Sequence, residues 1–312
     1  MQKAQQIINE IKKVIVGKDA QISKVLMTVL ARGHILIDDI PGVGKTTLAL
    51  SFSKAVALDY QRIQFTPDVM PSDVVGFSML NKKTNEFEYK PGAAICNLLL
   101  ADEINRTSSK TQAALLELME EGKVTVDGVT RELPKPHIVI ATQNPVGSAG
   151  TQLLPESQLD RFAIRLTIGY PDLTSEMRMM RDRRGANPMD TIVAVASKED
   201  LLAMQNEVDA IHRSDAVYDY MARLARGTRE NPLISCGLSP RGLITLSNMA
   251  AACAYMNGRN YVTPDDVRFV FTDVCAHRMV MSPQAKLSGV TADAALEKIL
   301  ASVPVPKIVT QQ

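Results

Sequence analysis

A glycine-rich loop between an apolar strand and a helix is the feature that most restricts how this chain can fold. His34 to Ile37 is a short apolar run typical of a buried strand, and a helical pattern begins at Thr46. Between them, Asp39 to Thr47 has the sequence DIPGVGKTT, whose glycines allow backbone amides to converge on phosphate groups. The order of strand, loop and helix predicts the phosphate-binding unit of an α/β protein.

The same loop contains the residue types that bind nucleotide phosphates and their metal. Lys45 can reach the β- and γ-phosphates, and the Thr46 hydroxyl can ligate Mg²⁺. Asp39 stands where the general pattern GxxxxGK[ST] has its first glycine. A chance glycine-rich turn would lack the flanking strand and helix, so we favour the phosphate-binding interpretation. The residues predicted to contact the nucleotide here are Pro41, Gly42, Val43, Gly44, Lys45, Thr46 and Thr47.

A second strand candidate ends in two acids. Leu98 to Ala101 is apolar and is followed by Asp102 and Glu103. The carboxyl ends of buried parallel strands border the crevice where ligands bind, so Asp102 can hold Mg²⁺ through water while Glu103 polarises the attacking water. Acids after a strand are often helix caps instead. The phosphate-binding loop upstream favours the catalytic interpretation.

Further apolar runs indicate that these two strands belong to a larger sheet. Strand candidates at 62–65, 97–101, 137–142 and 163–168 alternate with helical patterns such as Ser108 to Glu121. Strands that alternate with helices form a parallel sheet with helices on both faces. The predicted fold class is therefore an α/β, P-loop parallel sheet sandwiched by helices.

Two segments inside this region have the pattern of inserted antiparallel β-hairpins. In 76–89 and in 123–133, turn-forming residues separate two β-prone arms, and the dipeptide Asp127-Gly128 is the stronger turn signal. Judged alone, either hairpin could be a surface decoration.

The second half of the chain has a different pattern. Strand signals stop near Pro171, and helices with capping residues follow from Ser197. We therefore predict an α/β nucleotide-binding domain at 1–187 and a smaller, all-helical lid domain at 188–312.

The overall composition restricts the partners of this chain. The net charge is +1, aromatic residues make up 4% and tryptophan is absent, so we expect no nucleic-acid binding through a general field or through base stacking. No apolar run approaches the ~20 residues of a membrane span, and the first residues lack the apolar stretch of a secretion signal. We expect a cytoplasmic protein that is not an integral membrane protein.

Six sequence blocks, in order along almost the whole chain, resemble the MoxR family of AAA+ ATPases. The blocks are PGVGKTT at 41–47, QFTPDVMPSD at 64–73, ADEINR at 101–106, ATQNP at 141–145, LPESQLDRF at 154–162 and GLSPR at 237–241. The acidic residue at position 39 is common in loops of this family. The family's Gly-Pro-(Leu/Ile)-Phe stretch is replaced here by PGAAIC at 91–96.

The resemblance implies roles for further residues. Asn144 corresponds to sensor 1, Arg161 to the arginine finger that a subunit offers to its neighbour, and Arg241 to sensor 2 of the lid. Without the family, these residues would be interpreted as a turn residue, a surface ion-pair partner and a helix-start arginine. Val16 and Gly17 correspond to the segment against which adenine packs.

The resemblance also implies a function. It indicates a homo-hexameric ring that binds ATP or ADP with Mg²⁺ and couples ATP hydrolysis to remodelling or maturation of a protein partner, such as one with a von Willebrand factor A domain. In related proteins the two hairpins face the ring centre or the partner. The alternatives are a magnesium-chelatase-type motor subunit, a DNA-associated AAA+ protein and a nucleotide switch with low turnover.

Overall fold

The core of the protein is a five-stranded parallel sheet with the strand order β2-β5-β8-β1-β9. The computed structural model describes residues 2–144, 154–182 and 187–306. The strands are β1 (Ile35–Asp38), β2 (Tyr60–Gln64), β5 (Leu98–Asp102), β8 (Ile138–Gln143) and β9 (Ile164–Leu166). The sequence predicted all five, with ends that differ by a residue or two, and the predicted fold class is confirmed.

Alternate residues of the sheet strands face two separate layers of the core. Ile35 and Leu100 pack with one cluster of buried residues, whereas Leu36 and Leu99 pack with another. Successive side chains of a strand point to opposite faces, so a strand that is covered on both sides must be apolar throughout. All five residues of β5 are buried, and the first four are apolar; only Asp102, at the carboxyl end of the strand, is charged.

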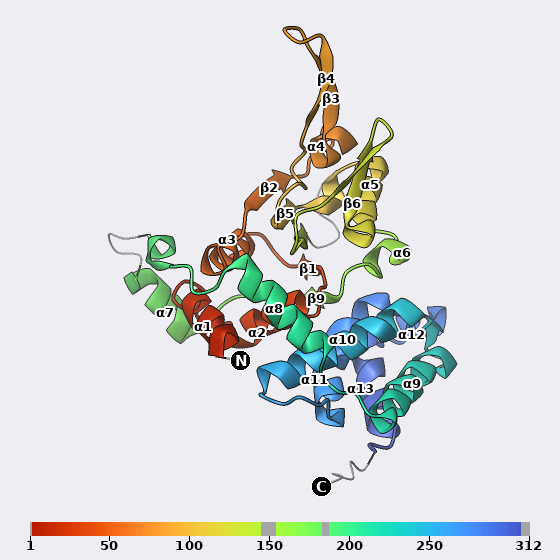
Figure 1. Ribbon diagram of the computed structural model, residues 1–312. Helices are drawn as coiled ribbons and strands as arrows, with labels where there is room; N and C mark the ends of the chain where they lie inside the picture. Colours follow the sequence, from red (N-terminus) through yellow and green to blue (C-terminus); the bar gives the residue numbers. More distant parts are fainter. Residues whose placement is uncertain (1, 145–153, 183–186, 307–312) are drawn as a thin grey trace.

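Helices cover both faces of the sheet, as the alternation of elements predicted (Figure 1). Residues of α1, α2 and α3 belong to the first cluster, and residues of α5 belong to the second. The helical elements of this part are α1 (Gln2–Ile11), α2 (Asp19–Leu30), α3 (Lys45–Ala55), α4 (Pro71–Val75), η1 (Ile104–Arg106), α5 (Ser109–Glu121), α6 (Glu156–Leu159) and α7 (Leu173–Asp182).

Two antiparallel hairpins interrupt the α/β alternation, as predicted. The strands β3 (Phe77–Asn81) and β4 (Glu86–Lys90) form the first, and β6 (Lys123–Val126) and β7 (Val129–Glu132) form the second. The β3–β4 hairpin projects from the top of the molecule, well clear of the sheet (Figure 1).

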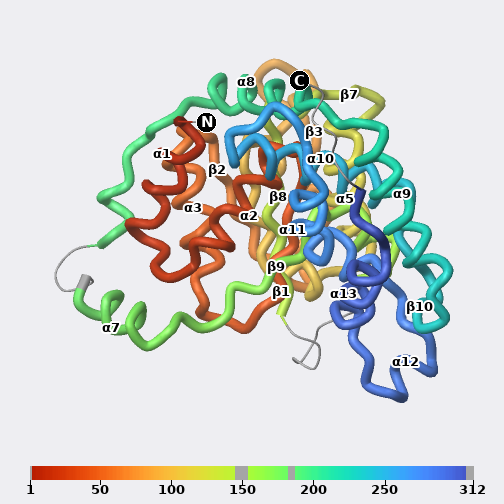
Figure 2. Tube along the Cα trace, turned by 90° about the horizontal axis from the view of Figure 1, so that it is seen from below, coloured from red at the N-terminus to blue at the C-terminus, as the bar shows by residue number. Residues whose placement is uncertain are grey.

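The lid consists of helices that pack on one end of the sheet and on α2. α10 and α8 contact α2, and α11 contacts β9. The lid helices α9, α12 and α13 lie on the side of the molecule opposite α1 and α7 (Figure 2). The helical elements after residue 187 are η2 (Pro188–Thr191), α8 (Lys198–Asp209), α9 (Asp215–Glu230), α10 (Pro240–Met256), α11 (Pro264–Cys275), η3 (Ala276–Arg278), α12 (Pro283–Leu287) and α13 (Ala292–Ser302).

One feature of the lid corrects the all-helical prediction. β10 (Ile234–Cys236) and β11 (Val280–Met281) pair antiparallel as a small ribbon between helices. Strands of two or three residues are too short to show the alternation by which a strand is recognised in sequence.

Among the described residues, no helix is long and apolar enough to cross a membrane.

The segment that follows the predicted domain boundary packs against the first domain. Lys54 donates to the carbonyl of Met189 at 3.0 Å, and the amides of Val195 and Ala196 both donate to the carbonyl of Ala55. The boundary at 187 stays a prediction, because this segment joins the two parts rather than belonging clearly to the lid.

Candidate functional site

The glycine-rich loop joins β1 to α3 at the carboxyl edge of the sheet. Gly42 and Gly44 have φ values of 86° and 95°, a region that side chains with a Cβ rarely adopt. Nothing lies within 4 Å of where a Cβ would stand on either glycine. The loop backbone is therefore open on that side, next to the first turn of α3, where free amides and the helix dipole favour an anion.

Asp39 anchors this loop to the rest of the sheet. Its carboxylate is almost fully buried and accepts hydrogen bonds from the amides of Ile40 at 2.8 Å, Ile168 at 2.6 Å and Gly169 at 2.6 Å. The acid at the position where a glycine is usual thus has a structural partner, the turn that follows β9. Sequence reasoning noted the substitution but not this contact.

Lys45 is buried at the start of α3, where its ammonium group donates to the carbonyl of Asp39. Burial lowers the pKa of Lys45, and the nearby carboxylates of Asp39, Asp102 and Glu103 oppose that shift without cancelling it. A desolvated cation among carboxylates gains much from contact with a phosphate.

A pocket of about 800 Å³ opens over the loop and brings most of the predicted nucleotide residues together. Its predicted residues are Val16, Pro41, Gly42, Val43, Gly44, Lys45, Thr46, Thr47, Asp102, Glu103 and Asn144. Further lining residues are Val14, Ile15, Lys18, Arg62, Gln64, Tyr170, Pro171, Glu176, Met179 and Met180. The apolar members among these can form the wall for a base, and the loop residues can form the phosphate end.

Gly17 departs from the expectation that it lines the base pocket. It has a φ of 71°, and a Cβ there would lie 2.2 Å from the Ser175 hydroxyl oxygen. Gly17 therefore permits close packing of the α1–α2 turn on α7, and its neighbour Val16 faces the pocket.

The acid pair at the end of β5 is held by hydrogen bonds from neighbouring strands. The Asp102 carboxylate accepts from the Thr142 hydroxyl at 2.5 Å and from Arg62 at 2.6 Å. The same Thr142 oxygen accepts from the amide of Glu103 at 2.9 Å. β2 and β8 flank β5, so these contacts depend on strand order, and sequence analysis found neither Arg62 nor Thr142.

Glu103 has an unusual backbone and two polar partners. Its φ of 58° lies in the left-handed region, an outlier of the kind that clusters at functional sites. Its carboxylate accepts from Asn144 at 2.9 Å and from Arg106 at 2.8 Å. Burial acts to raise the pKa of Glu103, but these two hydrogen bonds and the positive charge of Arg106 together hold the pKa below its usual value. The carboxylate is therefore ionised at neutral pH.

The side chains at the phosphate end fit a hard divalent cation. The Thr46 hydroxyl and the buried Asp102 carboxylate both line the pocket, and oxygen donors of this kind suit Mg²⁺. Proteins usually hold Mg²⁺ with one or two side-chain oxygens together with substrate phosphates. Thr46 and Asp102 supply two such side chains here.

Arg161 and Arg241 do not line this pocket. Both lie at a second, smaller cavity of about 240 Å³, and both form ion pairs with Glu120. Arg161 contacts Glu120 at 2.9 Å. Arg161, the predicted arginine finger, and Arg241, the predicted lid sensor, thus lie together at Glu120 and not at the glycine-rich loop of their own chain.

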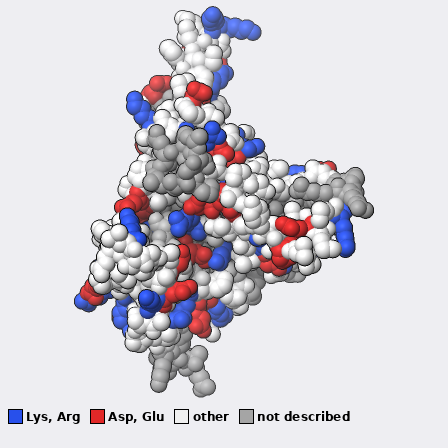
Figure 3. Space-filling view, turned by 180° about the vertical axis from the view of Figure 1, so that it is seen from behind, with Lys and Arg blue, Asp and Glu red and all other residues white. Residues whose placement is uncertain are grey.

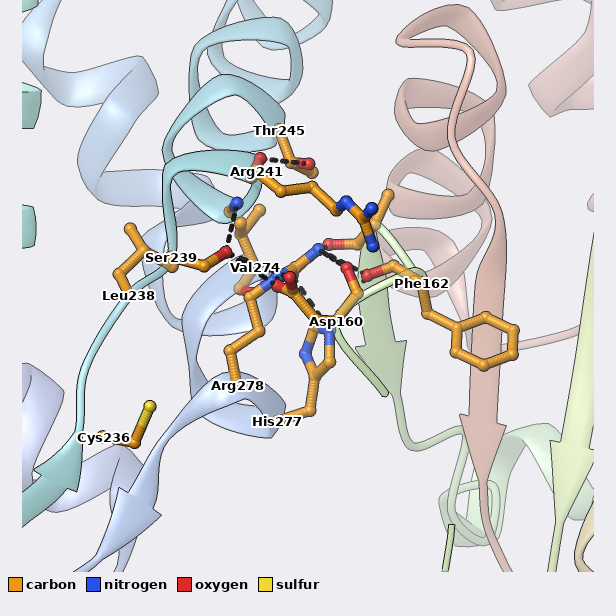
Figure 4. A network of polar contacts seen from close by, with 12 residues as sticks. Asp160, Phe162, Cys236, Leu238, Ser239, Arg241, Thr245, Val274, His277 and Arg278 are labelled. Carbon is orange, nitrogen blue, oxygen red and sulfur yellow. Dashed lines mark hydrogen bonds and ion pairs between the residues drawn. The ribbon is translucent and has the colours of Figure 1, made fainter. Parts of the chain in front are cut away.

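A buried polar network joins Asp160 and Phe162, which flank Arg161 in the chain, to the lid (Figure 4). Arg278 donates to the Asp160 carboxylate at 2.8 Å and to the carbonyl of Phe162 at 2.6 Å. Ser239, which caps α10, donates to the same carboxylate at 3.0 Å. Burial acts to lower the pKa of Arg278, and Asp160 opposes that shift. Sequence analysis did not find Arg278, because nothing near it in the chain indicates a partner.

The fold and this pocket define a P-loop ATPase of the AAA class. Residues 34–164 match the model of the "ATPase family associated with various cellular activities (AAA)", and residues 226–299 match the AAA lid domain. The chain is similar over 98% of its length to a crystal structure of a candidate ATPase from Cytophaga hutchinsonii, of which it covers 96%, with 37% identity and a TM-score of 0.91.

Two relatives identify the family more narrowly. The chain is 46% identical over 299 residues to the uncharacterised protein YeaC of Bacillus subtilis, covering 96% of this chain and 93% of that protein. It is 35% identical over 310 residues to chaperone MoxR1 of Mycobacterium tuberculosis, covering 96% of this chain and 82% of that protein. The chain belongs to the MoxR family of AAA+ ATPases.

The contacts of Asp39 predict that it stabilises the nucleotide-binding loop. Asp39→Asn keeps the size of the side chain but removes the charge from a group that accepts hydrogen bonds from three amides. Hydrogen bonds to charged groups contribute about 1.5–3 kcal/mol, so we expect ATP affinity to fall about tenfold. Titration calorimetry measures the affinity. Asp38→Asn, which changes the neighbouring acid that pairs with Arg165 at 3.9 Å, is the control. Unchanged affinity in Asp39→Asn would contradict the anchoring role.

Proposed function

We propose that this protein binds ATP with Mg²⁺ in the pocket over the glycine-rich loop and hydrolyses it. The observation that carries this proposal is the convergence of Lys45, Thr46, Asp102, Glu103 and Asn144 on one pocket from three neighbouring strands. A cation, two metal-binding oxygens, an ionised carboxylate and an amide are the groups that phosphoryl transfer to water requires.

Each of these side chains has a separate task in the proposed reaction. Lys45, which donates to the carbonyl of Asp39 in this structure, would bind the β- and γ-phosphates. Thr46 and Asp102 would hold Mg²⁺, which would offset charge on the phosphate oxygens. Glu103 accepts a hydrogen bond from the attacking water and orients it. Asn144, which already contacts Glu103, holds the same water or the γ-phosphate.

Two substitutions separate binding from chemistry. Lys45→Ala removes the buried cation, so ATP affinity should fall by about tenfold to a hundredfold. Glu103→Gln keeps the shape of the side chain but is a poor base, so ATP should bind normally while turnover falls by about 10²–10⁴-fold. Calorimetry and phosphate release measure the two effects. Turnover at the parental rate in Glu103→Gln would refute the role of Glu103.

We further propose that the active site is completed by a second copy of the chain in a homo-hexameric ring. Arg161 and Arg241 are needed as cations near the transferred phosphate, yet both lie at the second cavity with Glu120, outside the pocket of their own chain. Arginines that are directed away from their own nucleotide can act on that of a neighbour. This arrangement links hydrolysis to movement between subunits.

A mixing experiment tests the shared site. Arg161→Ala should bind ATP nearly normally but hydrolyse it about 10³–10⁵-fold more slowly, the range found for arginine fingers. Mixed with Glu103→Gln, it should regain part of the activity, because some interfaces pair an intact Glu103 with a neighbour's intact Arg161. Mixed rings verified by mass spectrometry that stay inactive would show that Arg161 acts within its own subunit.

The final part of the proposal is that hydrolysis remodels a protein partner that carries a von Willebrand factor A or related domain. The relative from Mycobacterium tuberculosis is named a chaperone. The β3–β4 hairpin supports this reading, because Phe77, Met79, Leu80 and Phe87 are exposed on it although apolar residues cost free energy in water. Its shaft is mostly uncharged and its tip is basic (Figure 3).

Shortening the hairpin tests the partner role. Replacement of Asn81 to Glu86 by a short glycine-containing turn should leave ATP affinity unchanged, because none of these residues lines the pocket, and should abolish stimulation of turnover by a von Willebrand factor A-domain protein of the same genome. Phe87→Ser should weaken the stimulation and Phe87→Leu, which keeps an apolar side chain, should retain it. Equal loss of ATP affinity and stimulation would indicate a structural hairpin.

A further inference from the structure

Glu120 is the shared partner of the two arginines that lie outside the nucleotide pocket. It stands at the C-terminal end of α5 and forms ion pairs with Arg161 and with Arg241. Arg161 follows α6 in the first domain, whereas Arg241 lies in the first turn of α10 in the lid. One carboxylate therefore joins two cations that come from different parts of the chain.

The backbone segments that carry these arginines are already fixed to each other. Asp160 directly precedes Arg161, and Ser239 caps the helix in which Arg241 lies. Ser239 donates to the Asp160 carboxylate at 3.0 Å, and the buried Arg278 donates to it at 2.8 Å. These contacts set the positions of the two backbones, but they do not involve the guanidinium group of Arg161 or of Arg241.

Glu120 supplies the constraint on those side chains. Two guanidinium groups repel each other at short range, and long exposed side chains lose conformational entropy when they are held in one place. A carboxylate that binds both offsets the repulsion and selects the conformers in which they lie together. Glu120, Arg161 and Arg241 together keep a net positive charge, so they can still attract a phosphate.

We propose that Glu120 is a positioning residue that holds Arg161 and Arg241 as one two-arginine unit for the nucleotide of a neighbouring copy of this chain. The inference rests on the shared-site function proposed above. Glu120 lines the second cavity and is absent from the lining of the nucleotide pocket, so it acts on turnover in the adjacent subunit and not on ATP binding in its own.

Substitution of Glu120 tests this assignment. Glu120→Gln and Glu120→Ala should bind ATP with the parental affinity and lose about tenfold in kcat, while Glu120→Asp, which keeps the charge on a shorter stem, should recover part of the loss. Glu120 is about one-third exposed, which favours folding of these variants. Glu121→Gln is the matched control, since Glu121 lies on the same helix end and pairs with Lys123 instead. It should keep the parental kcat.

Mixing with Glu103→Gln identifies the subunit on which Glu120 acts. Glu120→Gln subunits provide an intact Glu103, and Glu103→Gln subunits provide an intact Glu120 with its arginines. Turnover per Glu120→Gln subunit should therefore rise towards the parental value in mixed rings. No rise, in a preparation where Arg161→Ala is rescued by the same partner, would overturn the role of Glu120 and leave the shared site intact.

Three other results would also overturn the proposal. If Arg161→Ala is also not rescued in verified mixed rings, the shared site itself fails, and the inference fails with it. If Glu120→Gln turns over faster than the parental protein, Glu120 restrains the arginines rather than positioning them, and the proposal is overturned. A parental kcat in both Glu120→Gln and Glu120→Ala would overturn it equally.

Discussion

The structure depends above all on the adjacency of β5, β8 and β1 in a parallel sheet. These strands are buried on both faces, and each ends at the same edge. Because side chains alternate along a strand, a slip of one residue in β5 would exchange its two faces and displace Asp102 from the edge. The buried apolar side chains therefore fix the register, and the register fixes the spacing between the glycine-rich loop, the acid pair and Asn144.

Charge compensation is the second constraint, because this edge buries several ionised groups. Lys45 lies near Asp39 and Asp102, and Arg62 pairs with Asp102 at 2.6 Å. A buried charge is stabilised only with a partner of opposite sign and with hydrogen bonds. Arg62 contacts one carboxylate oxygen of Asp102 and Thr142 contacts the other, so both oxygens have a partner within the site.

A set of buried polar contacts joins the lid to the residues on both sides of Arg161. Arg278 donates to the carbonyls of Phe162 and Ala163 as well as to Asp160, and His277 contacts the carbonyl of Phe162 at 3.0 Å. These buried polar groups have partners only while lid and segment stay together, and loss of such partners is costly. A movement of the lid would therefore move Arg161, which links the lid to the proposed site in the next subunit.

The sequence by itself determined the strands of the five-stranded sheet, the glycine-rich loop, the acid pair, the two hairpins and the capped helices of the lid, because hydrophobic period and turn chemistry are local properties. The capping boxes at Ser197 and Thr263 are present as the sequence indicated. Only the tertiary structure decided strand order, the partners of Asp39 and Asp102, the place of Gly17 and the meeting of Arg161 with Arg241. Asp39 and Ile168 are 129 positions apart, and Glu120 and Arg241 are 121 apart. Contacts at such separations follow from how the elements pack, which no local pattern specifies.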